Sequence, residues 1–510
     1  ERNDMMDFTP VARHFLAKRA SRTDRWAAEG EDIQRAQLAW LLSRGGNTAY
    51  GKSVGLAGCD GYEAFRERVP MVGYEPLRPY VMRMIRGERD VLWRGRCLRY
   101  AQSSGTSGGK SKYIPVTADS LRRNHYPGAS DSVAHYLRAT PGSRMFSGKG
   151  FILGGSFANE LHEEDIASGV RIGDLSATLI DRIPAGAGLF RVPSKRIALM
   201  PDWEEKLPAL ANAALRCNIT NISGVPSWFL TMIRMVLQMT GAERITDVWR
   251  NLEVFFHGGI AFSPYREEYA RLCDPAQMHY VETYNASEGF FASATSPGDR
   301  ETLLQIDSAV FYEFLPLEGD SPIPLWEVQQ GKVYELIITA ANGLWRYRIG
   351  DTVRIESTAP VKITIAGRTK SFINAFGEEV MEYNADDAIA SAMRLTGARI
   401  ANYTVAPVYA RNGERGCHQW IIEWLTPPTD TAAFAAELDR RLQEVNSDYQ
   451  AKRSHDIFLA PPQVVTVPAG TFDRWLETHG NGKLGGQRKI PRLSNDRRIA
   501  EQLGVTERQP

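Results

Sequence analysis

The stretch from Tyr100 to Lys112 combines residue types that bind phosphate: it reads Tyr-Ala-Gln-Ser-Ser-Gly-Thr-Ser-Gly-Gly-Lys-Ser-Lys. Glycine lets backbone N–H groups approach phosphate oxygens closely, hydroxyl groups donate hydrogen bonds to them, and lysine neutralises their charge. These residue types predict a loop that holds the phosphates of a nucleotide. The alternative is a flexible surface loop, because short glycine clusters often match such motifs by chance.

The same stretch differs from the P-loop of nucleoside triphosphatases. That motif has four residues between its first Gly and the Gly-Lys pair. Here three residues separate Gly105 from Gly109 and Lys110, and the loop is richer in hydroxyl groups. The spacing fails by one residue, so we expect a different kind of phosphate loop.

A second segment, 284–289, reads Tyr-Asn-Ala-Ser-Glu-Gly and follows a predicted strand at 278–283. Mg²⁺ favours one or two carboxylates together with phosphate oxygens, so Glu288, preceded by Ser287, could hold Mg²⁺ against a substrate phosphate. The ring of Tyr284 could stack on a purine. The alternative is a turn between a strand and a helix, with Ser287 as the cap and Tyr284 in the core.

A third segment, 347–351, reads Tyr-Arg-Ile-Gly-Asp and belongs to a predicted hairpin. Residues 333–341 and 344–349 are its strands, and the Asn-Gly pair between them predicts a type I′ turn. The second strand would end at Asp351, whose carboxylate could accept two hydrogen bonds from ribose hydroxyls. The alternative is an Asp in the turn that leaves the hairpin.

The elements that must position these segments predict an α/β fold, because short apolar runs alternate with Gly/Pro turns and helical stretches from Phe151 onward. Residues 251–256 are predicted to form a buried strand that ends at His257-Gly258-Gly259. Segment 31–42 is a predicted helix whose apolar face contains Ile33, Ala36, Trp40 and Leu41.

A boundary near Gly367-Arg368 divides the chain into predicted domains at 1–367 and 368–510. The second region is about the usual size of one domain, and we expect a small α+β unit. Its predicted strands are 400–406 and 418–425. Its predicted helix, 431–449, carries Phe434, Leu438, Leu442 and Val445 on a core-facing side.

The composition is that of a soluble globular protein, with 43% hydrophobic and 24% charged residues among 510. The formal net charge of +1 gives no overall field that favours nucleic acid. No apolar run reaches the length of a membrane span. The five cysteines lie far apart without CxxC spacing, which argues against a disulfide framework or a structural zinc site and favours the reducing cytoplasm.

The three segments, in this order, resemble the nucleotide motifs of the Gretchen Hagen 3 (auxin-responsive) acyl acid amido synthetases. The matching patterns are Ser-Ser-Gly-Thr-Ser-x-Gly-x-x-Lys at 103–112, Tyr-x-Ala-Ser-Glu-Gly at 284–289 and Tyr-Arg-x-Gly-Asp at 347–351. Further similarities at 65–70, 225–228, 256–259 and 487–492 extend the resemblance over nearly the whole chain. The family belongs to the acyl-adenylating enzymes, with acyl-CoA synthetases and firefly luciferase. The alanine- and arginine-rich composition is typical of a bacterial member.

The resemblance implies a large N-terminal domain of mixed β-sheets and helices that binds ATP and an acyl acid, followed by a small, mobile α+β lid. It implies two steps with ATP and Mg²⁺. A carboxylate attacks the α-phosphate of ATP to give an acyl-adenylate and pyrophosphate. An amine, usually that of an amino acid, then attacks the acyl carbon to give an amide and AMP.

The resemblance also implies the site residues. The phosphate, adenine, metal and ribose positions that match the family's motifs are Ser103, Ser104, Gly105, Thr106, Ser107, Lys110, Lys112, Gly258, Gly259, Tyr284, Ala286, Ser287, Glu288 and Asp351. Lys112 and Glu288 are expected to act in catalysis, Glu288 as the Mg²⁺ ligand. Lys489, in Gln-Arg-Lys-Ile-Pro-Arg, is expected to contact the α-phosphate and carboxylate during adenylation, with Lys483 as the competing candidate.

Three functions are compatible with these residues. The first is the amide-forming ligase, acting on a small-molecule acid and an amine without nucleic acid or membrane, as a monomer or weak oligomer. The second is an acyl-CoA or carrier-protein ligase, in which a thiol replaces the amine. The third is a nucleotide-binding protein without turnover, which Glu288, Asp351 and a lid lysine argue against. The acid pocket is expected within Phe151–Trp228, where aromatic and aliphatic residues are abundant.

Overall fold

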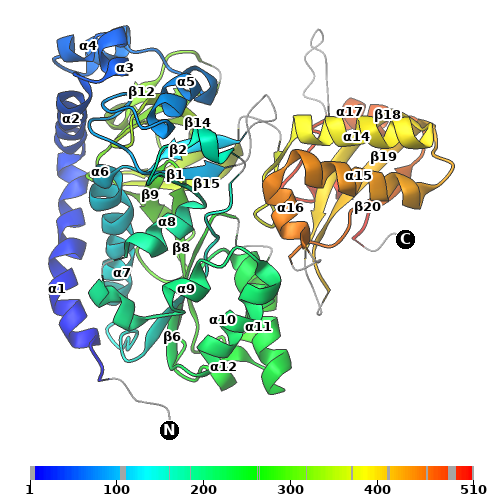
Figure 1. Cartoon of the computed structure of the whole chain (residues 1–510), viewed down its shortest axis with the longest axis horizontal. Helices are drawn as coiled ribbons and strands as arrows, with labels where there is room; N and C mark the ends of the chain where they lie inside the picture. The colour runs from blue at the N-terminus through cyan, green and yellow to red at the C-terminus, as the bar shows by residue number, and fades with distance from the viewer. Residues whose placement is uncertain are drawn as a thin grey trace. The chain divides into compact units, whose positions relative to one another are not determined.

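The computed structural model describes residues 6–103, 111–159, 161–183, 185–260, 262, 265–317, 319–368, 372–409, 414–454, 458–479 and 490–507. The chain divides into two compact units, both visible in Figure 1. The N-terminal unit comprises residues up to 369 except for short segments at 104–110 and 263–269, and the C-terminal unit contains residues 370–510. The predicted domain limits at 367 and 368, and the mobility of the C-terminal domain, remain predictions.

A mixed sheet of twelve strands, counted over the described residues, forms the centre of the N-terminal unit. Its order is β12-β11-β13-β14-β15-β10-β9-β8-β7-β6-β3-β5. From β5 to β8 the neighbouring strands are parallel, whereas those from β8 to β12 are antiparallel. The strands are β3 Lys149–Ile152, β5 Arg191–Val192, β6 Ile219–Gly224, β7 Val254–Gly258, β8 His279–Ala286, β9 Gly289–Ser293, β10 Thr302–Leu304, β11 Val310–Pro316, β12 Ile323–Pro324, β13 Val333–Ala340, β14 Leu344–Thr358 and β15 Val361–Arg368. The α/β fold class is thereby confirmed.

A smaller sheet of the same unit carries the ends of the first motif. Its order is β2-β1-β4, with β1 Arg99–Ser103 antiparallel to β2 Lys112–Pro115 and parallel to β4 Arg171–Gly173. Tyr100 and Ala101 of β1 are completely buried and join the main core with Tyr113 and Ile114 of β2. This apolar lead-in anchors both ends of the predicted phosphate loop in the core.

Helices cover the two sheets, and Figure 1 shows α1 and α2 in succession along one side of the N-terminal unit. α1 packs against α7, and α2 packs against β11. The helices before residue 280 are α1 Thr9–Arg22, α2 Trp26–Gly45, α3 Ala49–Val54, α4 Tyr62–Arg68, α5 Tyr74–Ile85, α6 Ala118–Ser120, α7 Tyr126–Ala139, α8 Leu175–Arg182, α9 Lys195–Ala198, α10 Trp203–Leu215, α11 Pro226–Thr240, α12 Ile245–Val248 and α13 Arg266–Leu272. A π-helical segment, η3 Leu121–His125, leads directly into α7.

The helix predicted at 31–42 is confirmed within α2, and of its predicted apolar face Ile33, Trp40 and Leu41 pack in or against the core, whereas Ala36 does not. Ala36 is exposed, and the fully buried positions of this stretch include Gln34 and Leu38. Gln34 donates from Nε2 to the carbonyl oxygens of Ile306 and Val310 at 2.6 and 2.9 Å. These bonds replace the water that a buried amide loses, so a polar residue takes a core position that hydropathy assigns to an apolar one.

Three strand predictions differ from the structure at their ends. β7 begins at Val254, three residues later than predicted, and includes His257 and Gly258. β8 continues beyond Thr283 to Ala286. β14 does not end at Asp351 but continues to Thr358, because β15 pairs with it and places Asp351 opposite Arg368.

The hairpin of β13 and β14 is confirmed, but its turn is not type I′. Three residues lie between Ala340 and Leu344, which pair with each other. Gly343 has φ +88°, whereas Asn342 is not among the residues with positive φ that a type I′ turn requires. The connection therefore matches the three-residue class with a left-handed glycine at its last position.

The C-terminal unit is a small α+β structure with its own core. Its three-stranded sheet has the order β18-β19-β20, and α14 packs beside α15, as Figure 1 shows. Its elements are β16 Phe372–Ile373, β17 Val380–Met381, α14 Glu382–Thr396, β18 Arg399–Val408, β19 Cys417–Thr426, α15 Thr431–Val445, α16 Ser447–Arg453, β20 Gln463–Val467, α17 Thr471–His479 and α18 Arg498–Gln502. The predicted helix at 431–449 ends at Val445, because the Asn446 side chain caps α16 by accepting from the N–H of Tyr449 at 2.7 Å.

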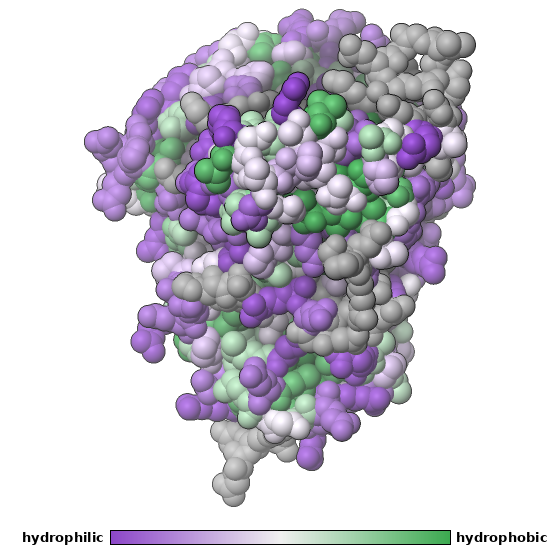
Figure 2. All heavy atoms as spheres, turned by 90° about the vertical axis from the view of Figure 1, so that its right-hand side faces the viewer, coloured by the Kyte–Doolittle hydropathy of each residue, from purple (hydrophilic) through white to green (hydrophobic). Residues whose placement is uncertain are grey.

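Hydrophilic side chains cover much of the face drawn in Figure 2, with smaller apolar areas between them. Over the described residues, every helix is too short or too polar to span a bilayer. Large apolar side chains that remain exposed include Leu395 and Leu425 of the C-terminal unit, at 65% and 64% exposure. Isolated residues of this kind are normal on a protein surface.

Candidate active site

The carboxyl ends of four neighbouring parallel strands form one edge of the large sheet. Gly154 follows β3, Gly224 ends β6, Gly258 ends β7, and Ser287-Glu288 follow β8. The register confirms that these ends lie side by side, since Gly224 pairs with His257 and Gly258 with Thr283. Ligands of open α/β sheets bind outside the carboxyl ends of the strands, so this edge is where a site is expected.

At both glycines of the predicted adenine-side turn, the local backbone geometry either leaves no room for a larger residue or strains it. A Cβ atom on Gly258 would lie 2.4 Å from the carbonyl oxygen of Thr283 on β8. Gly259 has φ +84°, a conformation that costs other residues strain. These residues keep the end of β7 close to β8, whatever ligand the edge binds.

The ends of the predicted phosphate loop pair with each other, with Ser103 opposite Lys112. The Gln102 amide donates to the Ser111 hydroxyl at 3.3 Å. The hydroxyl of Tyr74 accepts from the N–H of Tyr113 at 2.7 Å. Ser104, Gly105, Thr106, Ser107 and Lys110 lie outside the described residues, and so do Lys483 and Lys489.

The structure brings the second and third motifs together through Tyr284 and Asp351. The Tyr284 hydroxyl donates to Oδ2 of Asp351 at 2.5 Å, and each residue is 6% exposed. The Tyr284 ring packs edge-on against Phe291, with ring centroids 5.1 Å apart. A carboxylate has about four lone-pair positions, so the bond from Tyr284 leaves Asp351 able to accept further hydrogen bonds. The proposed purine stacking and ribose binding remain predictions.

A second contact joins the same motifs at Glu288. Oε1 of Glu288 lies 3.5 Å from the hydroxyl of Tyr347, and Glu288 is 7% exposed. Ser287 and Glu288 form the turn of the β8–β9 hairpin, where Ala286 pairs with Gly289. The strand-to-helix turn with Ser287 as the cap is therefore wrong, because the chain reverses into a strand, whereas the other part of that alternative, Tyr284 in the core, is confirmed.

The side chains around Glu288 fit a metal ion that takes most of its ligands from a bound nucleotide and from water. Among the described residues, no group of three or more His, Cys, Asp or Glu side chains could form a protein-only metal site. Mg²⁺ accepts one or two carboxylates and takes its remaining oxygens from phosphates and water. Glu288, in the turn after β8 at the carboxyl edge of the parallel strands, fits this type of coordination.

The third motif is positioned by residues that the sequence did not single out. Arg346 has φ +42° at a register shift of the β13–β14 pair, which marks a β-bulge. Its guanidinium binds both carboxylate oxygens of Glu313, at 2.9 and 2.8 Å, and both side chains are almost fully buried. The carbonyl oxygen of Val69 accepts from the same guanidinium at 2.7 Å. In the sequence, the hint of this ion pair is that Glu313 and Arg346 each stand between apolar or aromatic residues of a strand.

These contacts give a structural role to the early segment at 65–70, which resembles the family. The chain beyond it forms a parallel bridge in which Val72 lies opposite Tyr347. Val72 accepts from the N–H of Arg348 at 2.9 Å and donates to the carbonyl oxygen of Arg346 at 3.1 Å. The segment therefore supports the backbone on both sides of Tyr347. The Arg348 side chain binds Glu335 through two bonds, at 3.0 and 2.6 Å, which raises the pKa of Arg348.

A buried histidine, His125, neighbours Asn285 of the second motif. His125, at the end of η3, is 2% exposed, and burial lowers its pKa to about 4. The neighbouring side chain of Asn285 opposes this shift. His125 is therefore neutral at physiological pH.

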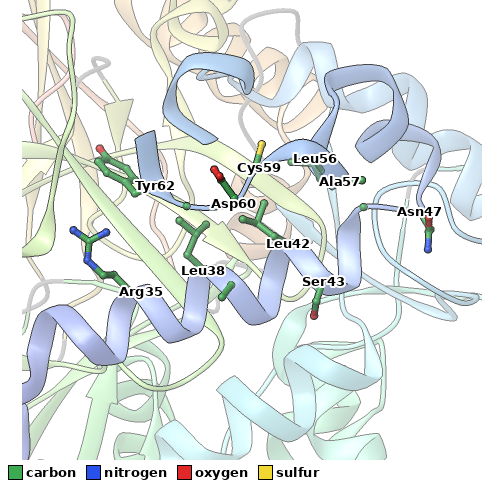
Figure 3. A pocket seen from close by; sticks show the side chains of 13 residues that line it. Arg35, Leu38, Leu42, Ser43, Asn47, Leu56, Ala57, Cys59, Asp60 and Tyr62 are labelled. Carbon is green, nitrogen blue, oxygen red and sulfur yellow. The ribbon is translucent and has the colours of Figure 1, made fainter. Parts of the chain in front are cut away.

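A cavity of about 600 Å³ lies away from the motifs, between α2 and the chain from Leu56 to Tyr62. Figure 3 shows Leu38 and Leu42 of α2 on one side, with Cys59 and Asp60 across from them. None of the residues that line it belongs to the three motifs. This cavity is separate from the strand edge described above.

Comparisons with known proteins agree on one family. The models described as GH3 family N-terminal domain, central domain and C-terminal domain match residues 19–278, 303–368 and 383–498. The chain is 24% identical over 543 residues to the indole-3-acetic acid-amido synthetase GH3.4 of Arabidopsis thaliana, covering 91% of this chain and 89% of that protein.

Two solved structures share the fold. AtGH3.15 acyl acid amido synthetase in complex with 2,4-DB aligns with a TM-score of 0.62 at 19% identity, covering 97% of this chain and 96% of that one. A 2-hydroxyisobutyryl-CoA ligase in complex with 2-HIB-AMP and CoA aligns with a TM-score of 0.51 at 13% identity, covering 99% and 94%. The N-terminal family model alone covers half of the chain, the other two match in the expected order, and the chain belongs to the GH3 family.

Proposed function

We propose that this protein is an ATP-dependent acyl acid amido synthetase, an AMP-forming ligase that joins a carboxylic acid to the amine of an amino acid. The observation that carries the proposal is the convergence of Tyr284 with Asp351 and of Glu288 with Tyr347. These contacts gather two motifs that are far apart in sequence at the carboxyl edge of the parallel strands. Membership of the GH3 family supports the same reaction, since relatives are named as amido synthetases.

The reaction needs positioning and charge stabilisation more than acid–base chemistry. A carboxylate resists nucleophiles because its charge is delocalised over the carbonyl group. Its oxygen forms a bond to the α-phosphorus of ATP, the bond to the bridging oxygen breaks, and pyrophosphate leaves. The amine nitrogen then bonds to the acyl carbon, AMP leaves with the electron pair of the broken C–O bond, and the nitrogen loses a proton. Correct placement of such reactants contributes a large part of the rate enhancement.

The residues have separate tasks in this proposal. Ser103 and Lys112 lie at the ends of the phosphate loop, and Asp351 accepts hydrogen bonds from the ribose. Mg²⁺, held by Glu288, offsets the negative charge of the phosphates when bound. Lys489 contacts the α-phosphate and the acid during the first step.

A specific observation supports a second candidate, an acyl-CoA or carrier-protein ligase. The fold is shared with a 2-hydroxyisobutyryl-CoA ligase, so the fold by itself is compatible with a thiol acceptor. The relatives named as amido synthetases favour the amine. We propose that the protein acts in the cytoplasm on small molecules, as a monomer or weak oligomer, and binds neither nucleic acid nor membrane.

Pyrophosphate exchange separates these functions. The protein is incubated with ATP, Mg²⁺, labelled pyrophosphate and a panel of carboxylic acids, and acid-dependent label in ATP is expected. Amino acids and CoA are then added in parallel, and products are identified by mass spectrometry. An amide supports the proposal, a thioester supports the second candidate, and nucleotide binding without exchange for any acid indicates a protein without turnover.

A further inference from the structure

The turn that carries Glu288 is held by two buried asparagines that belong to none of the three motifs. Asn342, in the β13–β14 connection, is completely buried, and Asn124, in η3, is 2% exposed. Both direct their amides at the backbone of the β8–β9 turn. Neither residue is assigned a function by the family motifs described above.

Asn342 holds the turn at Glu288 itself. Its Nδ2 donates to the carbonyl oxygen of Glu288 at 2.9 Å, and its Oδ1 accepts from the N–H of Leu344 at 3.3 Å. The next residue, Gly343, has φ +88°, and a Cβ atom there would lie 2.6 Å from Cβ of Leu92. The backbone beside Asn342 therefore lies close against Leu92, and the Asn342 side chain is held by one hydrogen bond at each of its polar atoms.

Asn124 holds the other side of the turn at Phe290. Its Oδ1 accepts from the N–H of Phe290 at 2.7 Å, and its Nδ2 donates to the carbonyl oxygens of Phe290 and Ser308 at 2.9 and 3.1 Å. Asn124 lies in the π-helical segment, and π-helical turns occur frequently at functional sites. The π turn ends at His125, whose neighbour Asn285 is the register partner of Phe290.

The residue between these two contacts leaves little room for movement. A Cβ atom on Gly289 would lie 2.7 Å from the ring of Phe291 and 3.2 Å from Oδ1 of Asn124. The backbone is thus held at Glu288, packed at Gly289 and held again at Phe290. Tyr347 then meets the Glu288 carboxylate from β14 at 3.5 Å.

We infer that Asn342 and Asn124 are positioning residues that orient the Glu288 carboxylate toward the metal–phosphate group of the nucleotide. The inference rests on the proposed function, because it assigns Glu288 to that group. The physical reason is that a flexible turn would have to be ordered each time the metal–nucleotide complex binds, whereas a turn already held by buried hydrogen bonds has been ordered during folding. Asn342 is expected to affect metal binding directly, since it bonds to the carbonyl group of the residue that would hold the metal.

The test compares Asn342→Ala with Asn384→Ala, a matched control from the C-terminal unit. Asn384 is also completely buried, donates to the carbonyl oxygen of Val445 at 3.0 Å and accepts from the N–H of Met381 at 3.0 Å. Mn²⁺ replaces Mg²⁺ so that its binding to the complex with α,β-methylene-ATP can be followed by electron paramagnetic resonance. Metal-free AMP binding is measured by calorimetry and thermal unfolding by calorimetric scanning.

Asn342→Ala is expected to raise the Mn²⁺ dissociation constant about three- to tenfold, the loss that corresponds to one hydrogen bond, with AMP binding nearly unchanged. Asn384→Ala is expected to lower the unfolding temperature without changing the Mn²⁺ constant. Equal Mn²⁺ constants for Asn342→Ala and the wild type would overturn the inference. If Asn342→Ala does not fold, Asn342→Asp keeps the acceptor for Leu344 but loses the donor to Glu288, and the same comparison decides.

Glu288→Gln separates the inference from the proposed function. If Glu288→Gln weakens Mn²⁺ binding and Asn342→Ala does not, the inference fails and the role of Glu288 stands. If Glu288→Gln has no effect on Mn²⁺, or the wild type binds no metal–nucleotide complex, the proposed role of Glu288 fails and the inference falls with it.

Discussion

At the scale of single residues, the Tyr284–Asp351 hydrogen bond links the second and third motifs, for which we propose contacts with the nucleoside. The donor and acceptor are 2.5 Å apart, and both side chains are 6% exposed. Hydrogen bonds to charged groups contribute about 1.5–3 kcal/mol, about twice the neutral value. The bond keeps one oxygen of Asp351 in place, so a ribose would meet a carboxylate with a defined orientation.

Asp351→Ala is expected to raise the KM for ATP roughly tenfold or more, because a contact of a charged group with the ribose is lost. The loss should be smaller for 2′,3′-dideoxy-ATP, which has no ribose hydroxyls to bind. Tyr284→Phe keeps the ring and removes only the hydroxyl, and it should give a smaller rise in KM. Equal losses on ATP and the dideoxy nucleotide in steady-state assays would mean that Asp351 does not contact the ribose.

Two buried histidines predict a loss of stability in acid. Burial lowers the pKa values of His125 and His135 to about 4, below the ordinary value for histidine. Between pH 6.5 and pH 4 the unfolded chain binds protons that the folded chain does not, so the free energy of unfolding decreases as the pH falls. Each histidine should contribute a slope of about 1.4 kcal/mol per pH unit within this window.

Chemical denaturation at a series of pH values measures this slope. His125→Gln and His135→Gln should each reduce it by about 1.4 kcal/mol per pH unit, the contribution of one proton. Above pH 6.5 neither the folded nor the unfolded chain binds these protons, so the two histidines no longer reduce the stability. If both variants retain the wild-type slope, the two histidines are not the groups that titrate.

At the scale of elements, the segment from Val69 to Val72 and the bulge at Arg346 hold β14 in position. Arg346 is 4% exposed, binds Glu313 with two hydrogen bonds and reaches the carbonyl oxygen of Val69. Bulges change the direction of a side chain, and this one directly precedes Tyr347. The early segment thus connects the first helices of the chain with the residue that contacts Glu288.

Glu313→Gln is expected to destabilise the N-terminal unit by about 3–5 kcal/mol, because it leaves the Arg346 charge buried without its partner. The control is Glu63→Ala, which removes the partner of Arg66 in an exposed pair on α4 and should change the free energy of unfolding by less than about 1 kcal/mol. Denaturant unfolding of both variants measures the difference. Similar effects in the two variants would show that the buried pair has no special importance.

At the scale of the whole molecule, the chain forms two compact units with separate cores. The N-terminal unit carries the strand edge with Glu288 and Asp351, and the candidate lysines belong to the C-terminal unit by sequence. The two half-reactions place different demands on a lysine. In the proposed reaction, a lysine contacts the α-phosphate during adenylation and then leaves room for the amine.

Lys489→Ala is expected to impair adenylation, measured by pyrophosphate exchange, and to spare amide formation from a presynthesised acyl-adenylate. Lys483→Ala, in the same segment, is the matched control and should affect neither half-reaction strongly. If Lys489→Ala slows both half-reactions equally, the lysine does not move between them. If Lys483→Ala shows the selective loss instead, Lys483 is the adenylation residue.

The sequence alone determined the order and chemical character of the three motifs, the α/β class, the β13–β14 hairpin and the family. Local residue types suffice for these, since glycine, hydroxyl and carboxylate groups have their properties wherever the chain places them. Element ends were less predictable. The Asn-Gly pair predicted a type I′ turn, yet a three-residue connection forms, with Asn342 pointing its amide at Glu288.

Only the tertiary structure decided which polar side chains are buried and what they contact. Gln34 occupies a core position because backbone groups of Ile306, in the turn before β11, and of Val310 and Tyr312, in β11, supply its partners. Tyr284 and Asp351 are 67 positions apart and lie on strands that are not neighbours in the sheet. Hydropathy and residue spacing depend only on the local sequence. The cost of burying a polar group depends on hydrogen-bond partners that come from elsewhere in the chain. The long-range hydrogen bonds that shape the site therefore became visible only in the folded molecule.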